Sequence, residues 1–230
     1  MNISSPATKY YGGEERIAHS AATNAIAIAF PGSSSFTAGS AYKPEVAVLA
    51  ALLGGKSSIK WSPGFSLLAK AAASSPGANV STIHSAYSDA GLLTINFSGP
   101  AEAIRNASIE AVKVLKTISE GPIAKEDFTK AVARAKYGSL EEVQNIESGL
   151  VSTGAGLVQG GKPFQFAEVT KALEGVTQEQ VKAVSISSSF LILRSNVIQA
   201  AKALLEGKAS VAAVGDLHVL PWAEELGLRV

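Results

Sequence analysis

One stretch, residues 43–99, constrains the fold more than any other, because it combines helix, turn and strand signals in a fixed order. An apolar helix is predicted over 44–53, which opens with proline and repeats valine and leucine at helical spacing. A glycine-rich loop over 54–62 ends it, and a Ser-Pro pair opens a second predicted helix that runs to about residue 74. Alternating apolar residues over 80–98, interrupted by Asp-Ala-Gly, predict an antiparallel hairpin.

The two strands of this hairpin each place apolar side chains on one face, so we expect one face of the hairpin to be buried. Ile83 and Tyr87 share a face of the first strand, and Leu93, Ile95 and Phe97 share a face of the second. Elsewhere the pattern predicts strands over 9–20, 24–30 and 210–215, followed by a tail over 216–230. It predicts helices over 100–120 and 164–173, and another helix from 125 onward with a break at Gly138-Ser139. This order predicts an α+β fold in which one largely antiparallel sheet carries helices on one face.

Composition excludes several classes of function. The 230 residues include 20 basic and 19 acidic side chains, so the net charge of +1 favours neither nucleic acid nor an acidic membrane as a partner. Cysteine is absent, which excludes disulfides and thiolate metal sites. No apolar run reaches the roughly 20 residues that span a bilayer, so we expect no direct membrane span. Residues 1–8 lack a signal pattern, so any organelle address would have been lost or would lie further upstream.

Residues 184–199 (VSISSSFLILRSNVIQ) interrupt the pattern around them. Joining Ala183 directly to Ala200 gives TQEQVKAAAKALLEG, an uninterrupted amphipathic helix, whereas the stretch itself is poor helix material. One hypothesis is an insertion foreign to the fold, such as translated intron sequence. An ordinary short strand with its own turn is the alternative, and both stay open. A transcript that always encodes these residues without interruption would exclude the intron.

The sequence lacks two common motifs, one for a catalytic nucleophile and one for phosphate binding. No G-x-S-x-G is present to form a nucleophile elbow. The run Gly54-Gly55-Lys56-Ser57 would need a glycine at residue 50 to be a phosphate-binding loop, and that residue is Ala50. A helix end explains the glycine pair better.

Several segments together carry a resemblance to a known family. They are AVLAALLGG at 47–55, GFSLLAKA at 64–71, SAYSDAGLLTINFSG at 85–99, AKYGSLEEVQNIES at 135–148 and KASVAAVGDLHVLPWAEELG at 208–227. In this order and spacing they resemble the C-terminal domain of the mitochondrial processing peptidase and bc1 core protein family, which has the M16 metallopeptidase fold. The likeness covers most of the chain, and it implies a single M16 C-terminal-type domain over 1–230.

The resemblance also implies what the chain lacks. Active members of the family bind zinc through H-x-x-E-H on a helix, where two histidines hold the metal and the glutamate polarises water. That motif occurs nowhere in this sequence, and the comparable helix reads PEVAVLAALL. The three histidines, His19, His84 and His218, have no ligand spacing. We therefore expect no catalytic residue, no metal site and no cofactor.

The glycine-rich loop is the candidate contact site. A similar loop helps to recognise presequences in the non-catalytic subunit of the processing peptidase. Here the loop carries Gly54, Gly55, Lys56, Lys60 and Trp61, and its lysines would repel an arginine-rich presequence. A structural or subunit-contact role is favoured on grounds of charge.

The resemblance implies a non-catalytic, structural core subunit of mitochondrial respiratory complex III, peripheral on the matrix side of the inner membrane. The implied partners are the other core protein (core protein 1), cytochrome b, cytochrome c1 and the chain's own N-terminal M16 domain. The alternative is the substrate-recognising, non-catalytic subunit of the mitochondrial processing peptidase. A free-standing domain is a third alternative.

Overall fold

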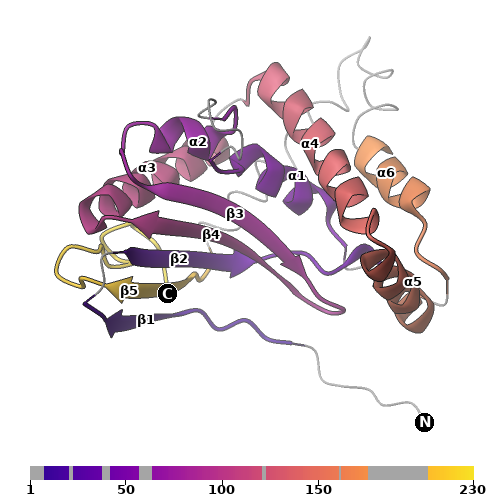
Figure 1. The fold of residues 1–230 in the computed structure, drawn as a ribbon, viewed down its shortest axis with the longest axis horizontal. Coiled ribbons are helices and arrows are strands. Elements are labelled where there is room, and N and C mark those ends of the chain that lie inside the picture. Colours follow the sequence, from indigo (N-terminus) through magenta and orange to yellow (C-terminus); the bar gives the residue numbers. More distant parts are fainter. Residues whose placement is uncertain are drawn as a thin grey trace.

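The computed structural model describes residues 8–20, 23–37, 42–56, 64–120, 123–160, 162–175 and 207–230. In these ranges the chain forms strands and helices in the following order (Figure 1): β1 (Gly13–Ala18), β2 (Asn24–Pro31), α1 (Pro44–Leu53), α2 (Leu67–Ala72), β3 (Asn79–Ala86), β4 (Gly91–Gly99), α3 (Ala101–Glu120), α4 (Lys125–Val143), α5 (Ile146–Gly160), α6 (Phe166–Gly175) and β5 (Ser210–Gly215). None of the described helices combines the length and the apolar character that crossing a bilayer requires.

The strands form one sheet in the order β1-β5-β2-β4-β3. Three of its pairings are antiparallel, and only β1 and β5 run parallel. The sheet therefore joins the two ends of the chain, with β5 inserted between β1 and β2. The prediction of an α+β fold with a largely antiparallel sheet is confirmed.

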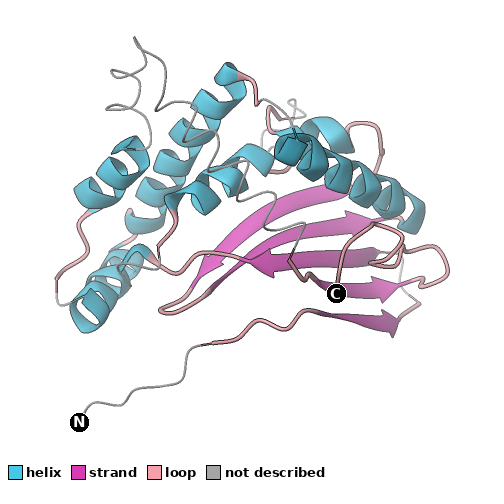
Figure 2. Ribbon diagram, turned by 180° about the vertical axis from the view of Figure 1, so that it is seen from behind, coloured by secondary structure: helices cyan, strands magenta, loops and turns pink. Residues whose placement is uncertain are grey.

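The core lies between one face of this sheet and the helices, which gather on one side of it (Figures 1 and 2). Alternate residues of the central strands point into this core and are almost fully buried: Ile26, Ile28 and Phe30 of β2, and Leu93, Ile95 and Phe97 of β4. In α3, the apolar stripe that helical spacing predicts to face inward is also buried: Ile104, Ala111, Leu115 and Ile118. Helix α4 packs mainly on α1, so it forms an outer layer away from the sheet.

The hairpin has one buried face, as predicted, but its first strand contributes a different residue. Ile83 and Tyr87 are 52% and 57% exposed. Val80 supplies the buried face instead, because it pairs directly with Phe97 of β4 on the core side. Helix α2 begins at Leu67, later than predicted, because the Ser66 hydroxyl caps it by accepting the N–H of Ala69. Residues 57–63 lie outside the described ranges.

The predicted break in α4 at Gly138-Ser139 is wrong. The helix continues to Val143, and the Ser139 hydroxyl donates to the Ala135 carbonyl inside it. The four glycines over 154–161 predict a turn or a frayed helix end, but residues 154–160 form the second half of α5. Helical spacing predicts that Leu140 and Leu150 point inward, but they are 41% and 68% exposed.

The last fifteen residues are not a loose tail. Leu220, Ala223, Leu226 and Leu228 are buried in the core, although the segment contains turns rather than regular structure. The buried guanidinium of Arg16 on β1 holds this segment by donating to the carbonyls of Leu217, Leu220 and Pro221. Its carbon also lies 3.9 Å from the ring centroid of Trp222.

Three predictions fall outside the described residues. The first is the insertion hypothesised over 184–199. The second is a capping box, which the spacing of Thr177 and Gln180 predicts for a helix from Gln178, and the third is a helix break, which the Gly121-Pro122 pair predicts. All three stay predictions.

Candidate functional site

The glycine-rich loop begins as a tight connection between α1 and the sheet. Gly54 has a φ of +56°, and its N–H donates to the Ala50 carbonyl at 2.8 Å, which ends α1. The chain then crosses to the edge of the sheet, where the Lys56 N–H donates to the Val80 carbonyl at 2.9 Å. The side chain of Lys56 is exposed. The start of the loop is therefore fixed to both α1 and β3.

Close backbone approaches explain why two glycines stand here. A Cβ on Gly55 would collide with the Val80 carbonyl oxygen and lie 2.7 Å from the Ser81 Cα. A Cβ on Gly54 would lie 2.8 Å from the Ser66 hydroxyl oxygen. That hydroxyl donates to the Gly55 carbonyl at 3.0 Å, so it joins the loop to the start of α2. The pair serves packing and a helix end, which agrees with the rejection of a phosphate loop.

An open groove of about 870 Å³ lies beside this loop. One wall of the groove is α4, and the other is formed by α1, the two ends of the loop and β3. Strand β3 contributes Ser81 and Thr82. Helix α4 contributes Lys130, Arg134, Tyr137 and Glu141. We call it the α4–β3 groove. Of the predicted contact residues, Gly54, Gly55 and Lys56 line it, whereas Lys60 and Trp61 lie outside the described ranges.

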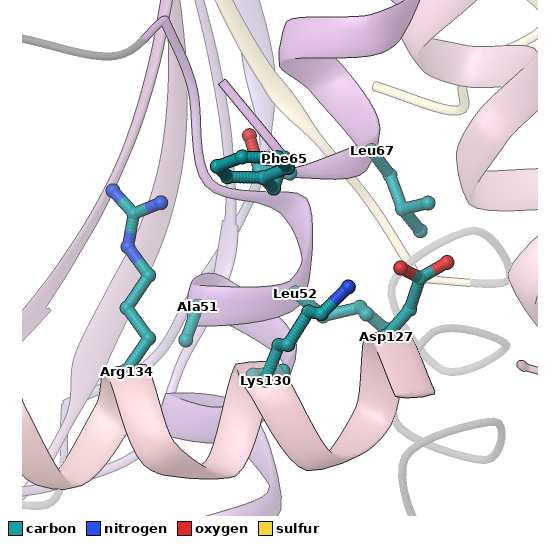
Figure 3. Close-up of a pocket in the computed structure, with 9 residues that line it drawn as sticks. Ala51, Leu52, Phe65, Leu67, Asp127, Lys130 and Arg134 are labelled. Atoms are coloured by element: carbon teal, nitrogen blue, oxygen red, sulfur yellow. The ribbon is translucent and has the colours of Figure 1, made fainter. Parts of the chain in front are cut away.

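The charged side chains of the α4–β3 groove are mostly cationic. Lys56, Lys130 and Arg134 stand against a single carboxylate, that of Glu141. Among the described residues, none of the three cations makes an ion pair. The Lys130 ammonium lies 5.9 Å from the ring centroid of Phe65. Figure 3 shows Lys130 and Arg134 extending from α4 on the side where Phe65 lies, around a smaller adjoining pocket.

A second cavity, of about 490 Å³, lies between the end of the β3–β4 hairpin and helices α4, α5 and α6. Among the described residues no charged side chain lines it, and its lining includes Tyr42, His84 and Tyr87. Burial, together with the nearby Glu45 carboxylate, raises the pKa of Tyr42 to about 12. Burial also lowers the pKa of His84, although a hydrogen bond between its Nε2 and the Ser33 carbonyl oxygen opposes the shift. Both side chains are neutral at physiological pH.

The histidines do not converge on a metal site. The Nε2 of His84 lies 3.1 Å from the backbone nitrogen of Ser33 and 3.2 Å from its carbonyl oxygen. His19 follows β1, and His218 lies in the C-terminal segment. Within the described ranges, no three side chains of His, Cys, Asp or Glu are placed to hold a metal ion. In α1, the helix comparable to the zinc helix of active M16 enzymes, Val46 and Leu49 are buried in the core.

Sequence reasoning found the loop but missed the opposite wall of the groove. Lys130, Arg134 and Tyr137 follow one another at helical spacing on α4, which marks them as one exposed face. Nothing local indicates that this face stands opposite β3, because residues 56 and 130 are brought together only when α4 packs on α1.

Three comparisons with known proteins agree. The family described as the peptidase M16 inactive domain matches residues 2–135. The mitochondrial cytochrome b-c1 complex subunit 2 of Neurospora crassa is 53% identical over 229 residues, which cover 100% of this chain and 46% of that protein. The subunit of the same name from Cryptococcus neoformans is 33% identical over 98% of this chain and 47% of its own length.

A solved structure has the same fold. A chain of complex III2 from Candida albicans, determined with Inz-5 bound, superposes with a TM-score of 0.72 at 16% identity, covering 94% of this chain and 49% of that one. This chain thus spans about half the length of the relatives that it matches. The family description also supports the expectation that this domain has no peptidase chemistry. The chain belongs to the M16 peptidase family, as an example of its inactive domain.

Proposed function

We propose that this chain is the C-terminal half of a structural, non-catalytic subunit of mitochondrial complex III, peripheral on the matrix side of the inner membrane. The observation that carries the proposal is the 53% identity to the Neurospora crassa cytochrome b-c1 complex subunit 2, which extends over 100% of this chain. Identity at this level over a whole domain supports a common fold and a closely related role. The role is therefore to hold other subunits in place rather than to bind a redox group.

The proposed partners are the N-terminal M16 domain that the resemblance implies, core protein 1, cytochrome b and cytochrome c1. Exposed apolar side chains on the described residues support contacts of this kind. Helix α5 presents Ile146, Leu150, Val151, Leu157 and Val158, each more than half exposed, on a helix with a single charged residue. A large apolar surface on one helix is typical of a protein–protein interface.

The substrate-recognising subunit of a processing peptidase is the second candidate. The loop would be its recognition element, but the exposed Lys56 and the cationic α4–β3 groove would repel a basic presequence. Charge therefore favours the complex III role.

Affinity purification of the endogenous full-length protein from a mild detergent extract, followed by mass spectrometry, tests the proposal. We expect cytochrome b, cytochrome c1 and core protein 1 at matching stoichiometry. Recovery of a single zinc-containing M16 partner without cytochromes would overturn the proposal and assign the chain to a processing peptidase. A tagged matrix enzyme of unrelated fold, purified in parallel, controls for carry-over.

A further inference from the structure

We propose that the α4–β3 groove binds an extended, acidic segment of a partner protein, which adds to the sheet as a strand beside β3. The inference rests on the proposed function in one respect: it takes another subunit of complex III as the source of this segment. Three features of the groove support it: an open strand edge, unpaired cations and exposed aromatic rings.

The strand edge is the first feature. β3 is the last strand of the sheet on this side. The Val80 carbonyl points outward, since it accepts the Lys56 N–H, and alternation along an antiparallel strand turns the backbone N–H and C=O of Thr82 the same way. Among the described residues no hydrogen bond reaches these two groups of Thr82. The Thr82 hydroxyl in the groove wall is also buried, with no hydrogen-bond partner in the described part of the chain.

An unpaired edge next to a groove is the arrangement that accepts an added peptide strand. The Lys56–Val80 hydrogen bond already begins a strand-like contact at one end. An incoming segment would continue that contact by donating to the Thr82 carbonyl and accepting the Thr82 N–H. Backbone pairing of this kind supplies affinity without requiring a particular sequence.

The charges select the kind of segment. Lys56 on one wall and Lys130 and Arg134 on the other face a groove that contains one carboxylate, Glu141. Aspartate or glutamate side chains on the incoming strand would pair with these cations from both sides. Phe65 and Tyr137 also line the groove, and their side chains are 76% and 62% exposed. Their rings would pack against the apolar parts of such a segment.

The chain's own loop supplies no acidic side chain for these cations. Residues 57–63 read SSIKWSP, with a lysine and no carboxylate. A membrane or nucleic acid would be drawn to the same cations but has no backbone to pair with Thr82. A peptide uses both features, and so we assign the groove to one.

Zero-length cross-linking with a carbodiimide in the purified native complex tests the assignment directly, because the reagent joins lysine amines only to carboxylates in contact with them. We expect Lys56 or Lys130 to be joined to aspartate or glutamate residues of another subunit. Lys113 serves as the control, since its exposed amine lies 2.7 Å from Glu110 of the same helix and should give only that internal link.

Variants of the full-length protein provide the second test. Lys130→Glu combined with Arg134→Glu should abolish the link at Lys56 and release the linked subunit at lower salt, whereas Lys113→Glu should change neither. Thr82→Pro should also abolish the link, because proline removes the outward N–H without breaking the ladder to β4. Thermal unfolding of each variant separates lost binding from lost folding.

Some outcomes would overturn the inference while leaving the proposed function intact. One is an intact complex III that contains the subunit but shows no link from Lys56 or Lys130 and no effect of charge reversal. Links confined to Glu179 or Glu206 of the same chain would show that the occupant is internal and would also overturn it. Conversely, links to an acidic segment of a protein outside complex III would support the groove assignment and count against the proposed function.

Discussion

The close approach of Gly55 to β3 gives a prediction at the scale of a single residue. A methyl group at this position collides with the Val80 carbonyl and the Ser81 Cα, both of which belong to the sheet backbone and cannot move away cheaply. We therefore expect Gly55→Ala to lower the free energy of unfolding by about 1–3 kcal/mol, the usual effect of overpacking. Urea unfolding of the 230-residue chain, with an unchanged m-value, measures the effect.

Gly138→Ala is the matched control for this substitution. Gly138 lies inside α4, and a Cβ there meets nothing within 4 Å. Alanine should therefore stabilise the helix by up to about 1 kcal/mol. If Gly55→Ala proved as harmless as Gly138→Ala, the anchoring of the loop against β3 would be wrong.

His84 gives a prediction about pH. Its folded-state pKa lies below the ordinary value of 6.5, chiefly because the ring is buried. The unfolded chain therefore takes up a proton at higher pH than the folded chain, and stability falls as the pH drops below about 6.5 toward the lowered folded-state pKa. His84→Gln should flatten this part of the stability profile, measured by urea unfolding between pH 7 and pH 5. An unchanged slope would mean that the buried ring does not titrate as described.

Residue-scale features were predictable only where their cause was local. The glycine pair at 54–55 was correctly predicted to end a helix, because the signal lies next to the helix itself. The collision that demands glycine at residue 55 comes from Val80, which is distant in sequence, and no pattern around the loop indicates it. The same holds for Lys130 and Arg134, which belong to the groove only through the packing of α4 on α1.

At the scale of elements, Arg16 joins β1 to the C-terminal segment. The side chains of Arg16 and Glu14 are 6% and 13% exposed and pair at 2.9 Å, and Glu14 also accepts the Ala223 N–H. Arg16→Ala would leave the Glu14 carboxylate buried without its cation and release three carbonyls, so we expect a loss of about 3–5 kcal/mol in unfolding free energy. Limited proteolysis should then cut within residues 216–230.

Glu225→Ala controls for the loss of an ion pair alone. Its carboxylate pairs with Arg105 at 2.7 Å, but both side chains are about 40% exposed. Removing an exposed pair should cost less than about 1 kcal/mol and leave the C-terminal segment resistant to protease. Equal effects of the two substitutions would show that Arg16 does not anchor the segment.

Elements were predicted well where periodicity was strong and poorly at their ends. The buried stripe of α3 and the apolar face of β4 match the sequence pattern residue by residue. The break assigned to Gly138-Ser139 failed because a helix tolerates glycine, and a serine hydroxyl can bond to its own helix backbone. The buried C-terminal segment was missed because its apolar residues lack any regular period.

At the scale of the whole molecule, the exposed surface of α5 predicts self-association of the isolated chain. The apolar residues there remain uncovered in the described part of the chain and should drive contacts between copies at micromolar concentration. Ile146→Lys with Leu150→Lys should reduce association in sedimentation velocity without loss of stability, since both side chains are exposed. Thr117→Lys with Thr129→Lys adds the same charge at exposed polar positions and should have no such effect. A parent chain that sediments as a clean monomer would contradict the prediction.

The parallel pairing of β1 with β5 has a consequence for the timing of folding. β5 stands between β1 and β2, and its Ala213 pairs with Arg16 on one side and Ile26 on the other. A chain that emerges from the ribosome N-terminus first presents β1 and β2 long before residues 210–215 exist. Until then β1 and β2 must remain unpaired with each other, because the hydrogen bonds of an early β1–β2 ladder would have to break before β5 could insert. Insertion of β5 between β1 and β2 is then a late step of folding, and it begins only after residues 210–215 have been synthesised.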